Sequence, residues 1–244
     1  MIAEELKALP GGSRVAVVTM LGSLCPVTKG HVQMFAEARR LLLEGLRPEL
    51  GLPAYAACVG YVSVNGDGYV AQKLKAKGDR PISKQERLAL IGMATVDLPW
   101  LEACQDSSLA VRELRALWPR LAVDEYVMNG ADDVVKYRKW QYAAADGAGG
   151  CRYITMGRPG SMEQLREGMR RSGVSESARF VLGPVLPDVS STDARAASKR
   201  GDRAALLELL HPAVADWLLR HDGAPVSQLQ GDTSEEVFRL LNSV

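Results

Sequence analysis

The chain has 244 residues, of which 47% are hydrophobic and 24% are charged, and its formal net charge is +1. This composition is typical of a globular protein, and the length suits one large α/β domain. A charge so close to zero excludes the strongly basic surface on which nonspecific nucleic-acid binding depends. Any anionic ligand must therefore be bound by local groups.

The cysteines indicate neither a disulfide framework nor a zinc site. They lie far apart and form no CxxC pair: Cys25, Cys58, Cys104 and Cys151. We therefore expect a reducing compartment and an intracellular protein, cytoplasmic or nuclear. We also expect neither a signal peptide nor a membrane span, because no basic-plus-apolar leader opens the sequence and no apolar run reaches the ~18 residues of a span. These features predict neither a membrane nor a nucleic-acid partner, and they leave monomer and homo-oligomer equally open.

Short apolar runs alternate with helical patterns along the chain. A short polar helix ends at "LPGG", and the Val-rich run 14–20 predicts a strand buried on both faces. A helix is predicted from Thr28, and Ser83 with Glu86 forms a capping-box pattern at the start of another. Segment 71–81, rich in lysine, is predicted to be a mobile surface loop. Further strands are predicted at 55–64, 100–105, 124–129, 152–157 and 178–183, and a further helix at 107–121.

This alternation predicts an α/β fold, a Rossmann-like doubly wound parallel sheet with helices on both faces. A helical tail from Ser191 to about His221 completes a single domain over 1–223, followed by an extension, 224–244, with a short helix. In such sheets ligands bind beyond the carboxyl ends of the strands. We expect five segments that follow predicted strands to meet at that edge: "GSLCP", "SVNGDG", "NGADD", "MGRPGS" and "PDVSSTD".

The segment "GSLCPVTKGH" (22–31) combines a tight turn with a helix start. Gly22 and Ser23 leave backbone N–H groups at the strand end, and Thr28 is a good cap for the helix that carries His31. Gly30 removes a side chain where a ligand would approach. Because a helix N-terminus attracts anions, His31 is placed to donate to a phosphate oxygen. Taken alone, a histidine beside a turn is more often a buried core residue, and that is the alternative for His31.

The segment "LPDVSSTDARAASKRG" (186–201) offers a second helix start with similar chemistry. Ser190, Ser191 and Thr192 precede Arg195 by less than two turns, so hydroxyls, free N–H groups and a guanidinium converge. Plain N-capping with a solvated Arg195 is the alternative. Two such helix starts, one early and one late in the chain, favour a shared site for a polyphosphate.

These motifs carry a resemblance. "GSLCPVTKGH" resembles the G-S/T-F-x-P…H signature of the nucleotidyltransferase superfamily, and "VSSTDAR" resembles its late I-S-S-T-x-x-R signature. With "NGAD" they are similar to the nicotinamide/nicotinic acid mononucleotide adenylyltransferases, in the eukaryotic-type branch, over Val15 to Gly223. The resemblance implies adenylyl transfer from ATP to either mononucleotide, giving NAD or its deamido form and pyrophosphate, by in-line attack without a covalent intermediate. It implies Mg²⁺ carried mainly by the ATP phosphates, with no metal site on the protein.

The resemblance also implies roles for individual residues. His31 and Arg195 would be catalytic at the ATP phosphates. The implied ATP-binding residues are Gly22, Ser23, Thr28, His31, Gly130, Asp132, Ser191, Thr192 and Arg195. The implied mononucleotide-binding residues are Ser23, Leu24, Lys77 and Trp140. Trp140 would stack on the pyridine ring, with a surface helix residue as the alternative. Lys77 would reach a phosphate, with a solvated loop lysine as the alternative.

Two residues depart from the family pattern. Leu24 stands where phenylalanine is usual, and Cys25 replaces the usual Asp or Asn. These changes leave the phosphate chemistry intact but put the mononucleotide pocket in question. Two other functions therefore stay open: a pantetheine-phosphate adenylyltransferase or cytidylyltransferase, and a non-catalytic nucleotide-binding or chaperone-like protein on the same fold. A dinucleotide-binding dehydrogenase is disfavoured because no G-x-G-x-x-G follows the first strand.

Overall fold

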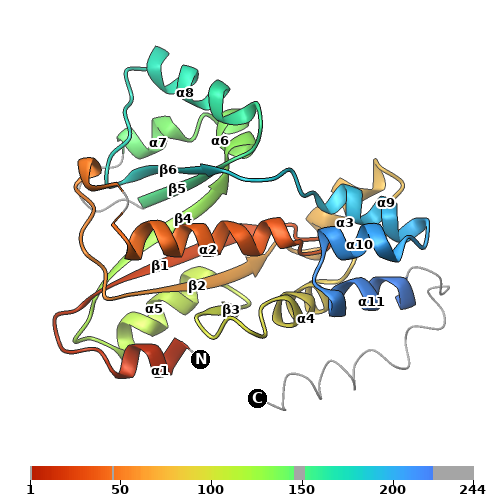
Figure 1. Cartoon of the computed structure of the whole chain (residues 1–244), viewed down its shortest axis with the longest axis horizontal. Coiled ribbons are helices and arrows are strands. Elements are labelled where there is room, and N and C mark those ends of the chain that lie inside the picture. The colour runs from red at the N-terminus through yellow and green to blue at the C-terminus, as the bar shows by residue number, and fades with distance from the viewer. Residues whose placement is uncertain (1, 46, 146–151, 222–244) are drawn as a thin grey trace. The chain divides into compact units, whose positions relative to one another are not determined.

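The computed structural model describes residues 2–45, 47–145 and 152–221, and these contain a six-stranded sheet (Figure 1). Its strands lie in the order β3-β2-β1-β4-β5-β6. The registers recorded for β1–β4, β2–β3, β4–β5 and β5–β6 are all parallel. The strands are β1 (Arg14–Gly22), β2 (Ala57–Val64), β3 (Leu101–Ala103), β4 (Ala122–Gly130), β5 (Arg152–Gly157) and β6 (Phe180–Val185). The strand order reverses at β1, as in a doubly wound sheet.

The chain divides into two compact units. The sheet unit takes its described residues from Met1–Met20, Gln33–Ser63 and Leu98–Asp188, and the helical unit from Leu21–Val32, Val64–Asp97 and Val189–Val244. Helix α2 (Lys29–Leu43) begins in the helical unit and continues in the sheet unit. The sheet unit also holds α1 (Ile2–Lys7), η1 (Pro48–Leu50), α5 (Ser107–Leu117), α6 (Ala131–Tyr137), α7 (Trp140–Ala145) and α8 (Ser161–Arg171). The helical unit holds α3 (Asp67–Lys75), α4 (Lys84–Ala94), α9 (Ser191–Lys199), α10 (Arg203–Leu209) and α11 (Pro212–His221).

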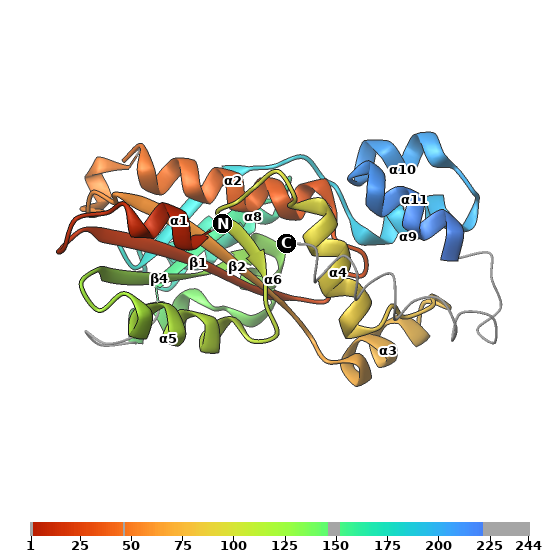
Figure 2. The same cartoon turned by 90° about the horizontal axis from the view of Figure 1, so that it is seen from below.

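Both faces of the sheet are covered by helices. On one face, Val15 and Val17 of β1 form a buried cluster with Val59 of β2 and with residues of α1 and α5. On the other face, a Cβ added to Gly60 of β2 would lie 2.9 Å from the ring of Phe35 in α2. Helices α2 and α5 accordingly lie on opposite sides of the sheet (Figure 2). This arrangement confirms the predicted doubly wound α/β class.

One predicted loop is a helix. Residues 67–75 form α3, so the prediction of a mobile loop over 71–81 is wrong for its first part. Val70 and Leu74, four residues apart, are buried on one side of α3, while its lysines face outward. Lysine is itself a good helix former, so a lysine-rich composition does not oppose this helix. The predicted extension 224–244 lies outside the described residues.

The other elements follow the sequence pattern closely. The capping box of α4 is present: the hydroxyl of Ser83 accepts from the backbone N–H of Glu86, whose carboxylate accepts from the backbone N–H of Ser83. Strand β5 has the predicted bounds, and β6 begins two residues later than expected.

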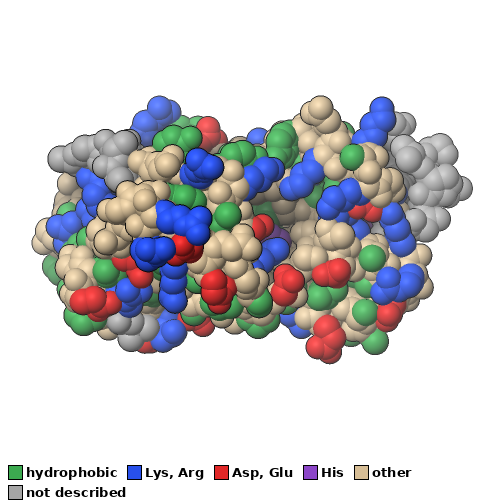
Figure 3. Space-filling model, turned by 90° about the horizontal axis from the view of Figure 1, so that it is seen from above, with side chains coloured by type: hydrophobic (Ala, Val, Ile, Leu, Met, Phe, Trp, Pro, Cys, Tyr) green, Lys and Arg blue, Asp and Glu red, His purple; other side chains and the backbone are tan. Residues whose placement is uncertain are grey.

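None of the described helices is long and apolar enough to cross a membrane. On the face drawn in Figure 3, Lys and Arg side chains are interspersed with Asp and Glu.

The packing around Gly60 gives a first prediction. A Cβ at this position would meet Leu101 at 2.6 Å as well as Phe35, so Gly60→Ala should overpack the sheet and cost about 1–3 kcal/mol of stability. Gly11→Ala, in the same unit with no heavy atom within 4 Å of the added Cβ, should change stability by no more than about 0.5 kcal/mol. Urea denaturation followed by circular dichroism measures both. Equal stabilities of the two variants would contradict the close approach of α2 to β2.

Candidate functional site

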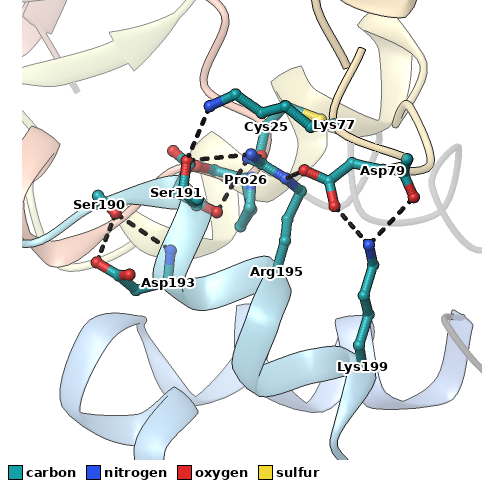
Figure 4. A network of polar contacts seen from close by, with 11 residues as sticks. Cys25, Pro26, Lys77, Asp79, Ser190, Ser191, Asp193, Arg195 and Lys199 are labelled. Carbon is teal, nitrogen blue, oxygen red and sulfur yellow. Dashed lines mark hydrogen bonds and ion pairs between the residues drawn. The ribbon is translucent and has the colours of Figure 1, made fainter. Parts of the chain in front are cut away.

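The early and late motifs are in contact within the helical unit. The hydroxyl of Ser191 donates to the carbonyl of Pro26 at 2.8 Å, and Arg195 donates to the carbonyl of Cys25 at 2.7 Å (Figure 4). A Cβ on Gly30 would lie 3.2 Å from the Cβ of Val189. The space beside Gly30 is thus occupied by Val189 of the chain itself, whereas the sequence led us to expect room for a ligand there.

The ring of His31 is oriented by Thr28. Its Nδ1 accepts a hydrogen bond from the backbone N–H of Thr28 at 3.0 Å and lies 2.7 Å from the threonine hydroxyl. A backbone N–H can only donate, so Nδ1 is an acceptor and the neutral ring carries its proton on Nε2. His31 thus belongs to a turn at the start of α2, and its Nε2–H is a donor.

The three hydroxyl residues before Arg195 have three different contacts. Ser190 is the N-cap of α9, because its hydroxyl accepts from the backbone N–H of Asp193 at 3.1 Å. Ser191 contacts Pro26, as described above. The hydroxyl of Thr192 lies 3.2 Å from Nη2 of Arg195 and 3.5 Å from the ammonium of Lys77. Plain capping therefore describes Ser190 alone.

Arg195 is a buried residue that links segments of the protein. It is 8% exposed, so the alternative of a solvated side chain is wrong. Its Nε donates to Asp79, its Nη1 to the carbonyls of Cys25 and Ser191, and its Nη2 to Thr192. Four of the five guanidinium N–H donors are thus engaged within the protein. These contacts give Arg195 a structural role in joining the two motifs, and its predicted role at the ATP phosphates stays a prediction.

Asp79 is the anionic partner of Arg195, and no sequence motif pointed to it. Its carboxylate lies 2.8 Å from Nε of Arg195 and 2.6 Å from the ammonium of Lys199. Burial acts to raise the pKa of Asp79, but the hydrogen bonds from Lys199 and Arg195 outweigh it and lower the pKa from its ordinary value. Asp79 is therefore ionised at neutral pH.

Two further basic residues at Ser23 were also missed. Arg87 is 0% exposed and donates to the carbonyls of Ser23, Asn65 and Ile82 at 2.9, 2.7 and 3.0 Å. Lys73 of α3 lies 3.2 Å from the hydroxyl of Ser23. The period of α3 was the signal that could have identified Lys73, had the segment not been interpreted as a loop.

The residues that depart from the family pattern are inside the protein. Leu24 is 3% exposed and has a φ of +41°, and its side chain lies 3.3 Å from the position of a Cβ on Gly22. Its predicted contact with a mononucleotide is therefore not supported, because the side chain packs over Gly22. Cys25 is buried, and burial raises the pKa of its thiol, which remains protonated at neutral pH.

The remaining predicted residues belong to the sheet unit. Gly130 precedes α6, and Asp132 is exposed in the first turn of that helix. Trp140 is 5% exposed, its Nε1 donates to Ser172 at 3.2 Å, and its ring covers Gly168 of α8. Trp140 therefore belongs to the core of this unit, and we leave it out of the site. This burial contradicts the alternative of a surface helix residue, whereas stacking on a pyridine ring stays a prediction.

No protein-family model and no curated protein sequence matches the chain. Two similar solved structures are a candidate nicotinate-nucleotide adenylyltransferase from Vibrio parahaemolyticus and TmcAL from Thermotoga maritima bound with α-thio ATP. The first is 12% identical with a TM-score of 0.39, over 84% of this chain and 99% of that chain. The second is 13% identical with a TM-score of 0.36, over 85% of this chain and 56% of that chain. Likeness at this level leaves the function to be argued from the residues of the site.

A second prediction tests whether the buried guanidinium of Arg87 stabilises the loop that contains Ser23. Arg87→Met removes the donors to three loop carbonyls and should cost about 3 kcal/mol or more, because buried carbonyls are left without partners. Arg220→Met, at an exposed position of α11 in the same unit, should stay within about 0.5 kcal/mol of the parent protein. Thermal and urea unfolding measure the difference. Comparable losses in the two variants would show that the buried guanidinium does not support the loop.

Proposed function

We propose that this protein transfers the adenylyl group of ATP to a pyridine mononucleotide, nicotinamide or nicotinic acid mononucleotide. The observation that carries this proposal is the contact between the "GSLCPVTKGH" loop and the start of α9, through Ser191 with Pro26 and Arg195 with Cys25. Two motifs typical of a nucleotidyltransferase phosphate site are thereby joined in one compact unit.

The groups around this contact suit a polyphosphate. Helix α9 has nine residues, and its first-turn N–H groups and dipole favour an anion. Lys77 lies beside Thr192 in that turn, and Lys73 lies beside Ser23 in the early motif. In the proposed complex these ammonium groups bind phosphate oxygens as point charges, while His31 donates from Nε2.

The proposed chemistry is a single in-line displacement. An oxygen of the mononucleotide phosphate attacks the α-phosphorus of ATP, the bond from that phosphorus to the bridging oxygen breaks, and pyrophosphate leaves with the electron pair. The attacking oxygen is already anionic at neutral pH, so the protein needs no general base. Its residues would act by positioning the two phosphates and by stabilising charge that develops at the α-phosphate, where we place the Nε2–H of His31.

A divalent cation is proposed to enter with the substrate. Among the residues that the structure describes, no group of three or more His, Cys, Asp or Glu side chains could hold a metal ion. Mg²⁺ commonly binds through substrate phosphates and water with few protein ligands. We therefore assign no step to a protein-bound metal.

The central test is turnover by a His31 variant. Purified protein with ATP, Mg²⁺ and either mononucleotide should release pyrophosphate and form the dinucleotide. His31→Ala should lower kcat by about 10² to 10³, by analogy with the loss of one donor at a developing oxyanion. His211→Asn is the matched control, since His211 accepts from the N–H of Ala213 near α11 and lies outside the proposed site. Full turnover by His31→Ala would show that His31 is not needed for the reaction and would contradict the central assignment of the proposal.

Parallel reactions separate the alternatives. Product with phosphopantetheine and ATP, or with CTP in place of ATP, would move the protein to another nucleotidyltransferase reaction. Nucleotide binding without any product would favour a non-catalytic binding protein. Comparing the two mononucleotides under the same conditions decides between the amide and the acid.

A further inference from the structure

Asp79 lies at a fixed position after the end of α3. The N–H of Gly78 donates to the carbonyl of Lys75, and the N–H of Asp79 donates to the carbonyl of Leu74. Gly78 has a φ of +63°, the left-handed conformation that this pair of bonds requires at a helix end. Asp79 is therefore held by the backbone, two residues beyond Lys77.

The Asp79 carboxylate joins this helix end to α9. Its two oxygens accept from Nε of Arg195 at 2.8 Å and from the ammonium of Lys199 at 2.6 Å (Figure 4). Lys199 also donates to the carbonyl of Gly78 at 3.1 Å. Arg195 and Lys199 are four residues apart and so share a face of α9. We call this arrangement of Asp79, Arg195 and Lys199 the Asp79 bridge.

Lys77, two residues before Asp79, lies at the first turn of α9. The ammonium of Lys77 lies 3.5 Å from the hydroxyl of Thr192, a contact too long and too exposed to order a lysine side chain without help. Three positive charges lie around one short helix: Lys77, Arg195 and Lys199. They repel one another unless an anion lies between them. Asp79 is the anion that contacts two of the three, and its side chain is as shielded from solvent as that of Arg195.

We propose that Asp79 is a positioning residue, whose bridge to Arg195 and Lys199 keeps Lys77 over Thr192 to bind a phosphate of the nucleotide. The identity of the ligand rests on the proposed function, whereas the bridge itself rests on the contacts above. Loss of the carboxylate should release the end of α3 from α9 and weaken polyphosphate binding, with a smaller effect on chemistry after binding.

The test compares Asp79→Asn with Asp216→Asn. Asp216 pairs with Arg203 at 3.0 Å in the same unit, so the control removes an ion pair without touching the bridge. Limited trypsin digestion should cleave after Lys75 and Lys77 about tenfold faster in Asp79→Asn, since the helix end opens more often, and at the parent rate in the control. Inorganic tripolyphosphate, followed by calorimetry, should bind about tenfold more weakly to Asp79→Asn alone, as expected if Lys77 is no longer held in place and one charged contact with the anion is lost.

Steady-state kinetics then separates positioning from general damage. Asp79→Asn should raise KM for ATP about tenfold while kcat changes by less than about threefold, because the lost interaction acts on binding. Lys199→Met keeps the pair of Asp79 and Arg195 and should show an intermediate effect in every measurement. This variant provides the test if Asp79→Asn fails to fold.

Each result has a defined meaning. Parent-rate digestion of Asp79→Asn, or unchanged binding of tripolyphosphate, would overturn the positioning role. If the parent protein shows no turnover with any nucleotide pair, the proposed function fails. Digestion and tripolyphosphate binding would still decide whether the Asp79 bridge orders Lys77.

Discussion

The candidate site depends on how the carbonyl groups of the loop after β1 are satisfied. The carbonyls of Ser23 and Cys25 accept hydrogen bonds from outside the loop, and a buried carbonyl without a donor is costly. Two buried arginines supply the donors. Arg87 from α4 binds the carbonyl of Ser23, and Arg195 from α9 binds that of Cys25. The conformation of the loop is thus determined by residues distant from it in the sequence.

The buried arginines and the exposed lysines of this region have different roles. A guanidinium has several donors in a rigid plane and can satisfy several carbonyls at once, which suits it to the protein interior. A lysine ammonium is a flexible point charge that remains at the surface, where Lys73 and Lys77 contact the hydroxyls of Ser23 and Thr192. Arg87 and Arg195 therefore support the geometry of the loop, whereas Lys73 and Lys77 are exposed cations beside the two motifs. Asp79 supports these different roles by neutralising the positive charge of Arg195 and Lys199 on α9.

Much of the fold could be predicted from the sequence, because hydrophobic period and turn residues are local signals. Strand β5 and the Ser83 capping box are examples, and the parallel sheet follows from the alternation of strands and helices. Helix α3 was missed since its composition suggested a loop, although Val70 and Leu74 already had helical spacing. The contact between the two motifs was predicted correctly, because both follow strands of one sheet.

The contacts of individual side chains could not be predicted in the same way. Burial of Arg195 depends on Asp79 and Cys25, which lie in separate segments, and no pattern around Arg195 reveals either partner. Trp140 lies in a helix of mixed composition, and its burial depends on Gly168 of α8, which removes the side chain that its ring would meet. Residue type and motif therefore predicted which two segments meet, whereas the contacts of each side chain follow only from tertiary packing.

The departures at Leu24 and Cys25 acquire a different meaning in this light. Both side chains are buried, so a change of residue type there alters loop packing before it alters any contact with a ligand. Leu24 adopts a left-handed φ of +41°, which is unfavourable for a leucine, and its side chain packs over Gly22. The adjacent carbonyls of Ser23 and Cys25 are the ones that Arg87 and Arg195 bind. The unusual pair therefore shapes the backbone of the loop, whose carbonyls the two buried arginines bind.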